Sequence, residues 1–364
     1  MKVFSRRVPI LAFTAVAPLC LLVFVHAPLN VQPTEKNQAF AEADADVTQF
    51  RLADLETKLA SMPKGPERDY FSGVLANRTG HVQDSIRLLN RALPAIRKSQ
   101  PARAALALET LADDYKKGFR YDDAAKTYQD LLTHFAAQLG ERLQDTKDDS
   151  GILHLLQVAP PQTITWNGPV RLKTRRNVIG SMVAELDVNG VKEPWLLDTG
   201  ANFSVLSRSF MRRLGLKPLP GFGQTQGGVT GIENPLQVAV LPTLQMGGAT
   251  LHNVVALVLD DANLNIDLGK TKYPINAIVG YPVFQALGTI TFRHGGIFEA
   301  GDAARQDASG TRMFMDLLTP VIQCGVEGQQ LPFTFDTGAS TSNLSVRYYE
   351  RFRADSGSWK KKRD

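Results

Sequence analysis

Two Asp-Thr-Gly triplets are the residues of this 364-residue sequence with the clearest potential for chemistry. They lie at Asp198-Thr199-Gly200 and Asp336-Thr337-Gly338, 138 residues apart (198 to 336), and each follows an apolar run and precedes an alanine. At the same offset further residues match in pairs: Gly190 and Gly328, Pro194 and Pro332, Ser204 and Ser342, Leu206 and Leu344, Ser207 and Ser345. The pattern indicates a duplicated half-domain, because its period is far longer than the about 20 to 50 residues of repeat arrays.

A pair of aspartates is able to hydrolyse a peptide bond without a metal or a covalent intermediate. One ionised carboxylate takes a proton from water while the other, protonated, donates to the scissile carbonyl. The two carboxyls must lie roughly 3 Å apart, where like charge prevents both from ionising. Threonine is able to hydrogen-bond to the other loop, and glycine lets the backbone approach the carboxylate. The candidate catalytic residues are therefore Asp198 and Asp336, supported by Thr199, Gly200, Thr337 and Gly338.

The composition is that of a globular protein with an export signal. Residues are 43% hydrophobic and 21% charged, and the net charge is +5. No basic run is interleaved with aromatic residues, so we expect no nucleic-acid partner. Residues 1–41, with a basic start and an apolar run from Val8 to Val25, predict a signal peptide or, if uncleaved, a membrane anchor. With either assignment, we expect the rest of the chain to lie outside the cytoplasm, in the periplasm or secreted. The scattered histidines and the two cysteines, Cys20 and Cys324, predict neither a metal site nor an internal disulfide.

Residues 47–150 carry apolar residues at helical spacing and predict a helical domain. Small and apolar residues between Gly73 and Ala92 recur in a similar order between Ala112 and Leu131, which is similar to two tetratricopeptide units. An ordinary antiparallel helical bundle is the alternative, since two units fall below the about three that an independent array needs. Small residues at these positions would let the two helices of a hairpin approach closely. Such helices also offer a surface for a protein partner.

From Pro160 onward, short β-type runs alternate with Gly, Pro and Asn. We assign residues 165–300 to a first β-lobe, 313–352 to the start of a second lobe, and 353–364 to a basic tail. Asn189-Gly190 predicts a two-residue hairpin turn before the first triplet. Ser207 predicts the N-cap of a short helix, and Gly288 the end of another.

Residues 170–345 resemble the aspartic peptidases of the retroviral and pepsin type, and most closely the exported bacterial proteins similar to retropepsins. The resemblance implies that Ile278-Val279-Gly280 packs beneath the first catalytic loop. It also implies a substrate-covering flap at Gly227, Gly228 and Gly231, which begins 29 residues after Asp198. The implied activity is that of an aspartic endopeptidase acting on peptides or proteins without a cofactor. The expected fold is α+β and multidomain: tetratricopeptide-like helical hairpins, then an all-β retropepsin-like lobe and an incomplete second lobe.

The second lobe is expected to be incomplete because the counterpart of Gly280 would fall beyond Asp364. Either the sequence is a truncated form of a longer peptidase, or a second chain supplies the missing wall. The catalytic pair would accordingly be Asp198 with Asp336, or Asp198 twice in a homodimer. A different alternative is a non-catalytic binding module that uses the helices and a degenerate protease fold. In pepsin-like enzymes a hydroxyl residue commonly stands at the positions of Ala201 and Ala339, and without that donor we expect activity nearer neutrality than for pepsin.

Asp336→Asn separates the two forms of the pair. If Asp198 and Asp336 act together within one chain, the substitution removes one of the two essential carboxyls, and we expect peptide cleavage to fall by about 10²-fold or more. The measurement is hydrolysis of a fluorogenic peptide by the purified variant. Activity retained at the wild-type level would rule out the intramolecular pair.

Overall fold

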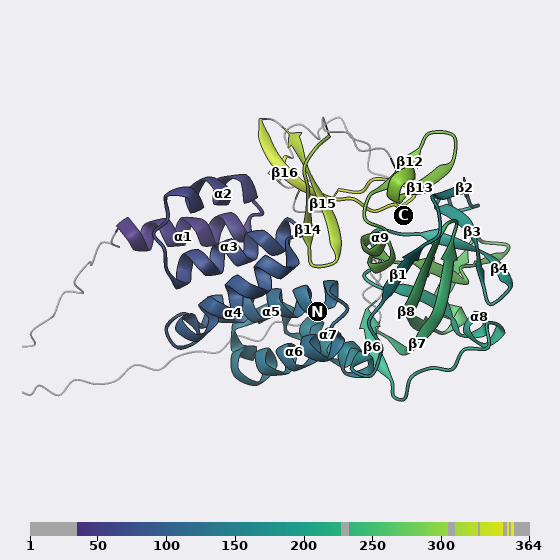
Figure 1. Ribbon diagram of the computed structural model, residues 1–364, viewed down its shortest axis with the longest axis horizontal. Coiled ribbons are helices and arrows are strands. Elements are labelled where there is room, and N and C mark those ends of the chain that lie inside the picture. Colours follow the sequence, from purple (N-terminus) through teal and green to yellow (C-terminus); the bar gives the residue numbers. More distant parts are fainter. Residues whose placement is uncertain are drawn as a thin grey trace, which may run out of the picture.

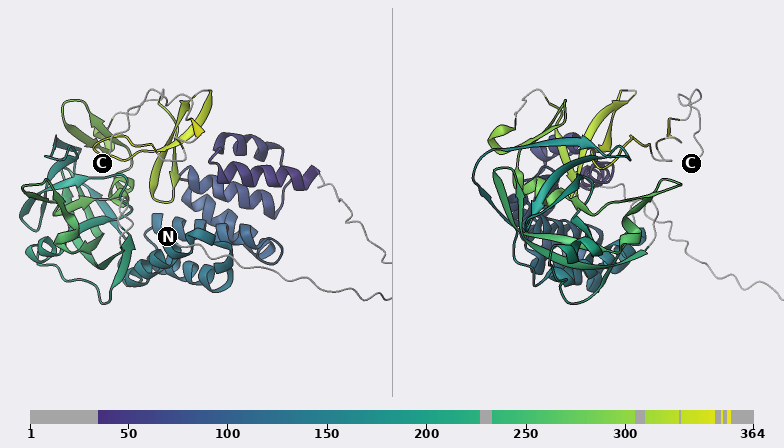
Figure 2. Two further views of the ribbon diagram at one scale, coloured as in Figure 1. Left: turned by 180° about the vertical axis from the view of Figure 1, so that it is seen from behind. Right: turned by 90° about the vertical axis from the view of Figure 1, so that its right-hand side faces the viewer.

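The computed structural model describes residues 35–226, 233–304, 310–326, 328–344, 348 and 351–352. Figure 1 shows three parts along the chain, which are a group of helices, a large β-lobe and a small sheet that lies between them. The view from behind in Figure 2 shows the same order. The predicted α+β multidomain class is therefore confirmed. Among the residues described, no helix is both long and apolar enough to cross a bilayer.

In the described residues from Glu35 onward, seven α-helices follow one another as successive hairpins: α1 Glu35–Thr48, α2 Leu52–Ser61, α3 Pro66–Arg78, α4 Val82–Ser99, α5 Pro101–Lys117, α6 Tyr121–Phe135 and α7 Leu143–Leu156. They extend past the predicted range 47–150 at both ends. Leu89, Ala92 and Ile96 of α4 follow helical spacing and are buried. A Cβ at Gly73 would lie 2.6 Å from the Leu89 Cγ, so the close approach of α3 and α4 depends on glycine. The Ala39-Phe40-Ala41 segment lies within α1, where Phe40 packs on Phe71.

The first lobe is a β-barrel with two short helices. One path of strands runs β12-β13-β2-β3-β4-β11-β5-β8-β7-β6, and an additional pairing of β3 with β7 closes its central part on itself. A buried cluster that includes Trp195, Phe284 and Phe298 fills this lobe. Its strands are β1 Thr163–Trp166, β2 Val170–Arg176, β3 Met182–Val188, β4 Val191–Leu197, β5 Ser204–Ser207, β6 Gly223–Gln226, β7 Glu233–Met246, β8 Ala249–Leu259, β9 Asn265–Asp267, β10 Lys272–Pro274, β11 Ala277–Val279, β12 Ile290–Arg293 and β13 Ile297–Ala300.

Turn and cap residues of the first lobe lie where the sequence predicts them. Asn189 and Gly190 join β3 to β4 with φ of 53° and 79°, as a two-residue hairpin turn requires. The Ser207 side chain accepts a hydrogen bond from the Phe210 N–H and caps α8, Arg208–Arg213. Helix α9, Tyr281–Leu287, ends at Gly288, whose φ is 71°.

The second lobe consists, in the described residues, of β14 Met313–Asp316, β15 Thr319–Val326 and β16 Gln329–Thr334. Its hairpin reproduces that of the first lobe at the 138-residue offset. Val183 pairs with Leu196 in the first lobe, and Val321 pairs with Thr334 in the second. The aromatic contact between Trp195 and Phe210, 6.0 Å between ring centroids, has its counterpart between Phe333 and Tyr348 at 5.8 Å. The internal repeat of the amino-acid sequence is therefore also a repeat of the structure.

The helical part packs on both lobes. One apolar cluster contains helical residues together with Phe203, Leu236 and Leu257 of the first lobe and Phe314 of the second. At the first lobe, Gln285 of α9 donates to the Lys117 carbonyl at the end of α5, over 2.7 Å. Both lobes are thus attached to one helical scaffold.

Gly280→Ala tests the packing beneath the first catalytic loop. A Cβ there would lie 2.3 Å from the carbonyl carbon of Phe203 and 2.4 Å from its oxygen. Backbone atoms cannot rotate away, so we expect the unfolding free energy to fall by roughly 1–3 kcal/mol in denaturant titrations of the full chain. The control is Gly151→Ala in α7, where nothing lies within 4 Å of an added Cβ, and a gain of about 0.5–1 kcal/mol is expected. Equal stability of the two variants would contradict this account.

Candidate active site

The two Asp-Thr-Gly loops lie against each other at the junction of the lobes. Asp198 directly follows β4, and Asp336 follows β16 after Phe335. A Cβ on Gly200 would lie 2.7 Å from the Cγ of Asp336, and a Cβ on Gly338 would lie 2.4 Å from the Cγ of Asp198. Each glycine thus faces the other loop's carboxyl, and any side chain there would displace it. The structure brings together the two aspartates and both glycines that the sequence singles out.

Reciprocal hydrogen bonds between the two threonines join the loops. The Thr199 N–H donates to the Thr337 Oγ1 over 3.1 Å, and the Thr337 N–H donates to the Thr199 Oγ1 over 3.1 Å. Each hydroxyl also donates across the junction: Thr199 to the Phe335 carbonyl at 2.7 Å, and Thr337 to the Leu197 carbonyl at 2.8 Å. Thr199 is buried. The four bonds are related by an approximate two-fold symmetry and fix each loop relative to the other.

Backbone amides hold each carboxyl in the same way. The Asp198 Oδ1 accepts from the N–H groups of Gly200 at 2.9 Å and Ala201 at 3.1 Å. The Asp336 Oδ1 accepts from those of Gly338 at 2.8 Å and Ala339 at 3.1 Å. Since alanine follows glycine in both loops, no hydroxyl adds a third donor from that position. The other oxygen of each carboxyl is left to face its partner.

Asp198 is the more enclosed of the two carboxyls, and its pKa is raised to about 6. Burial is the largest cause, followed by the negative charge of Asp336 and a hydrogen bond between the two carboxyls. The amides of Gly200 and Ala201 oppose the shift because they favour the ionised form. Asp336 is exposed to solvent. The pair therefore holds one proton most readily on Asp198 in weakly acidic solution.

Strand β11 supports the first loop from below. It pairs parallel with β4, Ile278 with Leu196 and Val279 with Leu197, and the Val279 carbonyl accepts from the Asp198 N–H at 3.0 Å. One residue beyond Gly280, the Tyr281 N–H donates to the Ala201 carbonyl at 2.8 Å. The packing that the resemblance implied for Ile278-Val279-Gly280 is present.

Two polar contacts across the junction involve residues that the sequence reasoning missed. Ser181, just before β3, donates from its hydroxyl to the Gly338 carbonyl at 2.9 Å. Thr319, at the start of β15, donates to the Asn202 Oδ1 at 3.4 Å. Ser181 and Thr319 are themselves 138 residues apart (181 to 319). A search for hydroxyl residues that match at the repeat offset, just before the hairpin of each lobe, would have found both.

The predicted flap residues Gly227, Gly228 and Gly231 lie outside the described residues. The strands on either side, β6 and β7, pair antiparallel, with Gln226 opposite Glu233. Gly221 lies two residues before β6, and a Cβ on it would lie 2.6 Å from Leu155 of α7. The helical part therefore packs against the chain where it enters β6. The flap assignment stays a prediction.

Comparison with known proteins finds a family match in the first lobe. Residues 184–283 match the family model described as aspartyl protease, a segment that contains Asp198 and Gly280. Among solved structures, the chain is similar to a retropepsin-like aspartic protease from Rickettsia conorii, with 20% identity over 38% of this chain and 92% of that one and a TM-score of 0.27. No curated protein matches the chain. The match to the aspartyl protease family model thus falls within the first lobe, around the first of the two motifs that the sequence singles out.

The raised pKa of Asp198 predicts a particular dependence of stability on pH. The folded state binds this proton more tightly than the unfolded chain does, so the contribution of Asp198 to the unfolding free energy falls as pH rises from 3.8 through about 6. Asp198→Asn removes the ionisation, and at pH 7 we expect a gain on the order of 1–3 kcal/mol. Urea unfolding between pH 4 and 8 measures it. Asp84→Asn, at an exposed helical carboxylate, is the control and should keep the wild-type slope. An unchanged slope in the Asp198 variant would contradict the prediction.

Proposed function

We propose that this chain is an aspartic endopeptidase whose catalytic pair is Asp198 and Asp336 of one molecule. The observation that carries the proposal is the reciprocal pair of threonine hydrogen bonds, which holds both carboxyls face to face. Thr199 directs its bonding groups to Thr337 and Phe335 of the same chain. This favours the intramolecular pair over the homodimeric one.

The different surroundings of the two carboxyls assign their roles. Asp198, enclosed and with its pKa raised to about 6, carries the shared proton, and the more exposed Asp336 is the base. Water attacks the carbonyl carbon of the scissile bond, Asp336 takes a proton from that water, and Asp198 gives its proton to the carbonyl oxygen. The C–N bond of the resulting gem-diol then breaks. The departing amine takes the proton from Asp336, and a gem-diol hydroxyl returns one to Asp198, which restores the starting state.

The proposed substrate is a peptide or protein in extended conformation. Extended peptides present their carbonyls to clefts that are built from β-strands, and the site here lies at the ends of β4 and β16. The basic and apolar start of the sequence supports action outside the cytoplasm. The proposed chemistry uses only side chains of this protein and water.

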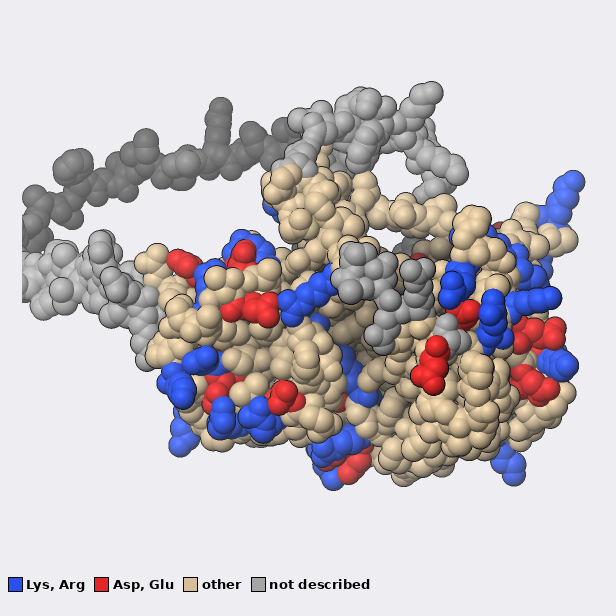
Figure 3. All heavy atoms as spheres, turned by 45° about the horizontal axis from the view of Figure 1, so that its top comes forward, with Lys and Arg blue, Asp and Glu red and all other residues tan. Residues whose placement is uncertain are grey.

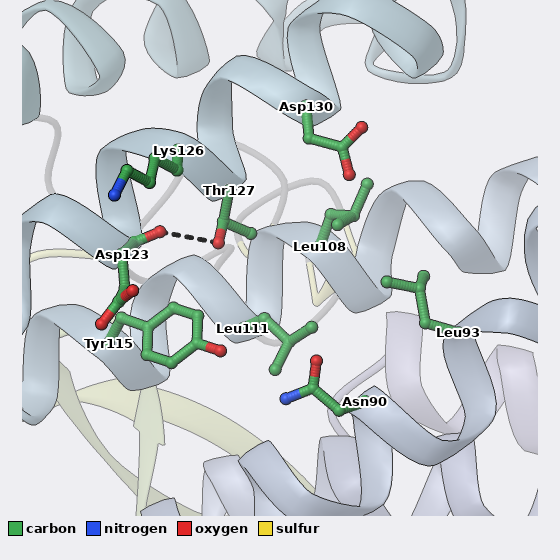
Figure 4. A pocket seen from close by; sticks show the side chains of 9 residues that line it. All are labelled: Asn90, Leu93, Leu108, Leu111, Tyr115, Asp123, Lys126, Thr127 and Asp130. Atoms are coloured by element: carbon green, nitrogen blue, oxygen red, sulfur yellow. Dashed lines mark hydrogen bonds between the residues drawn. The ribbon is translucent and has the colours of Figure 1, made fainter.

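A second candidate function is protein binding by the helices. It is supported by a cavity of about 230 Å³ whose lining residues lie between Asn90 and Asp130, in the helical part. Leu93, Leu108 and Leu111 line it together with polar side chains that include Asn90 and Asp123 (Figure 4). Over the helical part, positive and negative side chains are interspersed on the face that Figure 3 shows. Such a surface suits a mixed-charge protein partner, and it is compatible with catalysis in the same chain.

The test of the proposed function is cleavage of casein and of an internally quenched peptide library between pH 4 and 8. We expect hydrolysis that a statine-type transition-state mimic inhibits, because the mimic places a tetrahedral hydroxyl between the carboxyls. Asp198→Asn should reduce the rate by about 10²–10⁴-fold. Asp84→Asn should cleave like the wild type. Cleavage that survives Asp198→Asn, or no cleavage of any peptide in the library, would overturn the proposal.

A further inference from the structure

In the sheet that carries Asp336, the buried apolar side chains lie on β14, on β15 and in the turn between them: Phe314, Met315, Leu318 and Val321. In β16 no described side chain is buried, whereas the last three residues of β4 are all buried in the first lobe. Phe314 of β14 belongs to the apolar cluster of the helices. The sheet therefore packs on the helical part, and the Tyr281 hydroxyl of α9 also contacts it, through a hydrogen bond to the Met315 sulfur at 3.2 Å.

Arg78 and Phe50 form the contact that holds the sheet. Arg78, at the end of α3, pairs with Asp316 and donates to the Met315 carbonyl at 3.3 Å, and its side chain is only 13% exposed. Its guanidinium lies 5.5 Å from the centre of the Phe50 ring. That ring stands edge-on to Phe314 at 6.2 Å. An ion pair, a hydrogen bond and aromatic contacts thus meet at the C-terminal end of β14.

The Phe50 backbone is itself in an unusual conformation. Its φ is 58°, in the left-handed region that bulky residues rarely adopt. In this conformation its carbonyl accepts a hydrogen bond from Gln323 of β15 at 3.0 Å. Helical residues therefore contact two of the three strands of the sheet.

A short path leads from Arg78 to the second aspartate. Met315, which Arg78 holds, pairs with Pro320 across the β14–β15 turn. The Pro320 carbonyl accepts from the Phe335 N–H at 2.8 Å, and Phe335 is the residue before Asp336. A shift of this turn would therefore move Asp336 relative to Asp198.

We infer that Arg78 is a positioning residue for the catalytic pair: by holding the β14–β15 turn it keeps Asp336 against Asp198. The helical part then belongs to the active site's framework and is more than an appended binding domain. The inference rests on the proposed function.

The test compares Arg78→Gln with Arg97→Gln in the full chain. Arg97 is a matched control, since it makes a bidentate pair with Asp130 at 2.5 and 2.8 Å and lies 5.2 Å over the Phe135 ring, all within the helices. For Arg78→Gln we expect kcat to fall about tenfold with KM nearly unchanged, because substrate contacts are retained while the pair is displaced. Arg97→Gln should keep the wild-type kcat even if its melting temperature falls. Equal kcat in the two variants would overturn the inference.

A second measurement does not require activity. Carbon-13 NMR titration of the Asp198 carboxyl should show a lower pKa in Arg78→Gln than in the wild type, because Asp336 and its charge have moved away. The exchanged pair Arg78→Asp with Asp316→Arg should restore part of the loss. An unchanged titration in a folded Arg78→Gln variant would refute the positioning role whether or not the wild type cleaves peptides. If the wild type shows the raised pKa but no cleavage, the proposed function fails and the positioning role stands.

Discussion

The hydrogen bonds between Thr199 and Thr337 are the interaction on which the rest of the site depends. Two carboxyls at close range repel each other when both are ionised. Left free, the two loops would separate. Each threonine instead accepts from the backbone of the opposite loop and donates to a carbonyl beyond it. Because these bonds are directional and shielded, they oppose the repulsion without neutralising either carboxyl.

The two halves of the site rest on different supports. Beneath Asp198, β11 pairs with β4 and binds the backbone of the catalytic loop, as part of a closed barrel. Beneath Asp336, the described strands form a three-stranded sheet. Contacts from the helices, including those of Phe50 and Arg78, hold that sheet, together with the contact between Tyr281 of the first lobe and Met315. The two catalytic loops are thus related by approximate symmetry, whereas the parts of the structure that support them differ.

This asymmetry also separates the two carboxyls chemically. The same pair of backbone amides binds each, so their local loops are equivalent. Burial and the neighbouring charge raise the pKa of Asp198, while Asp336 remains open to solvent. A pair of identical residues is able to divide acid and base roles when their surroundings differ in this way.

The sequence by itself determined the local features: the repeat, the Asp-Thr-Gly loops, the turn at Asn189-Gly190, the cap at Ser207 and the helical character of the first part. Each depends on the chemistry of a few adjacent residues, or on a periodicity that is visible in a single sequence. Only the tertiary structure decided that the Asp198 and Asp336 loops of one chain lie together. It also showed that Ser181 and Thr319 join the lobes, and that Arg78 and Phe50 hold the second one. These contacts link residues far apart in the chain through side chains that are common on any surface, so no local pattern distinguishes them before folding brings them together.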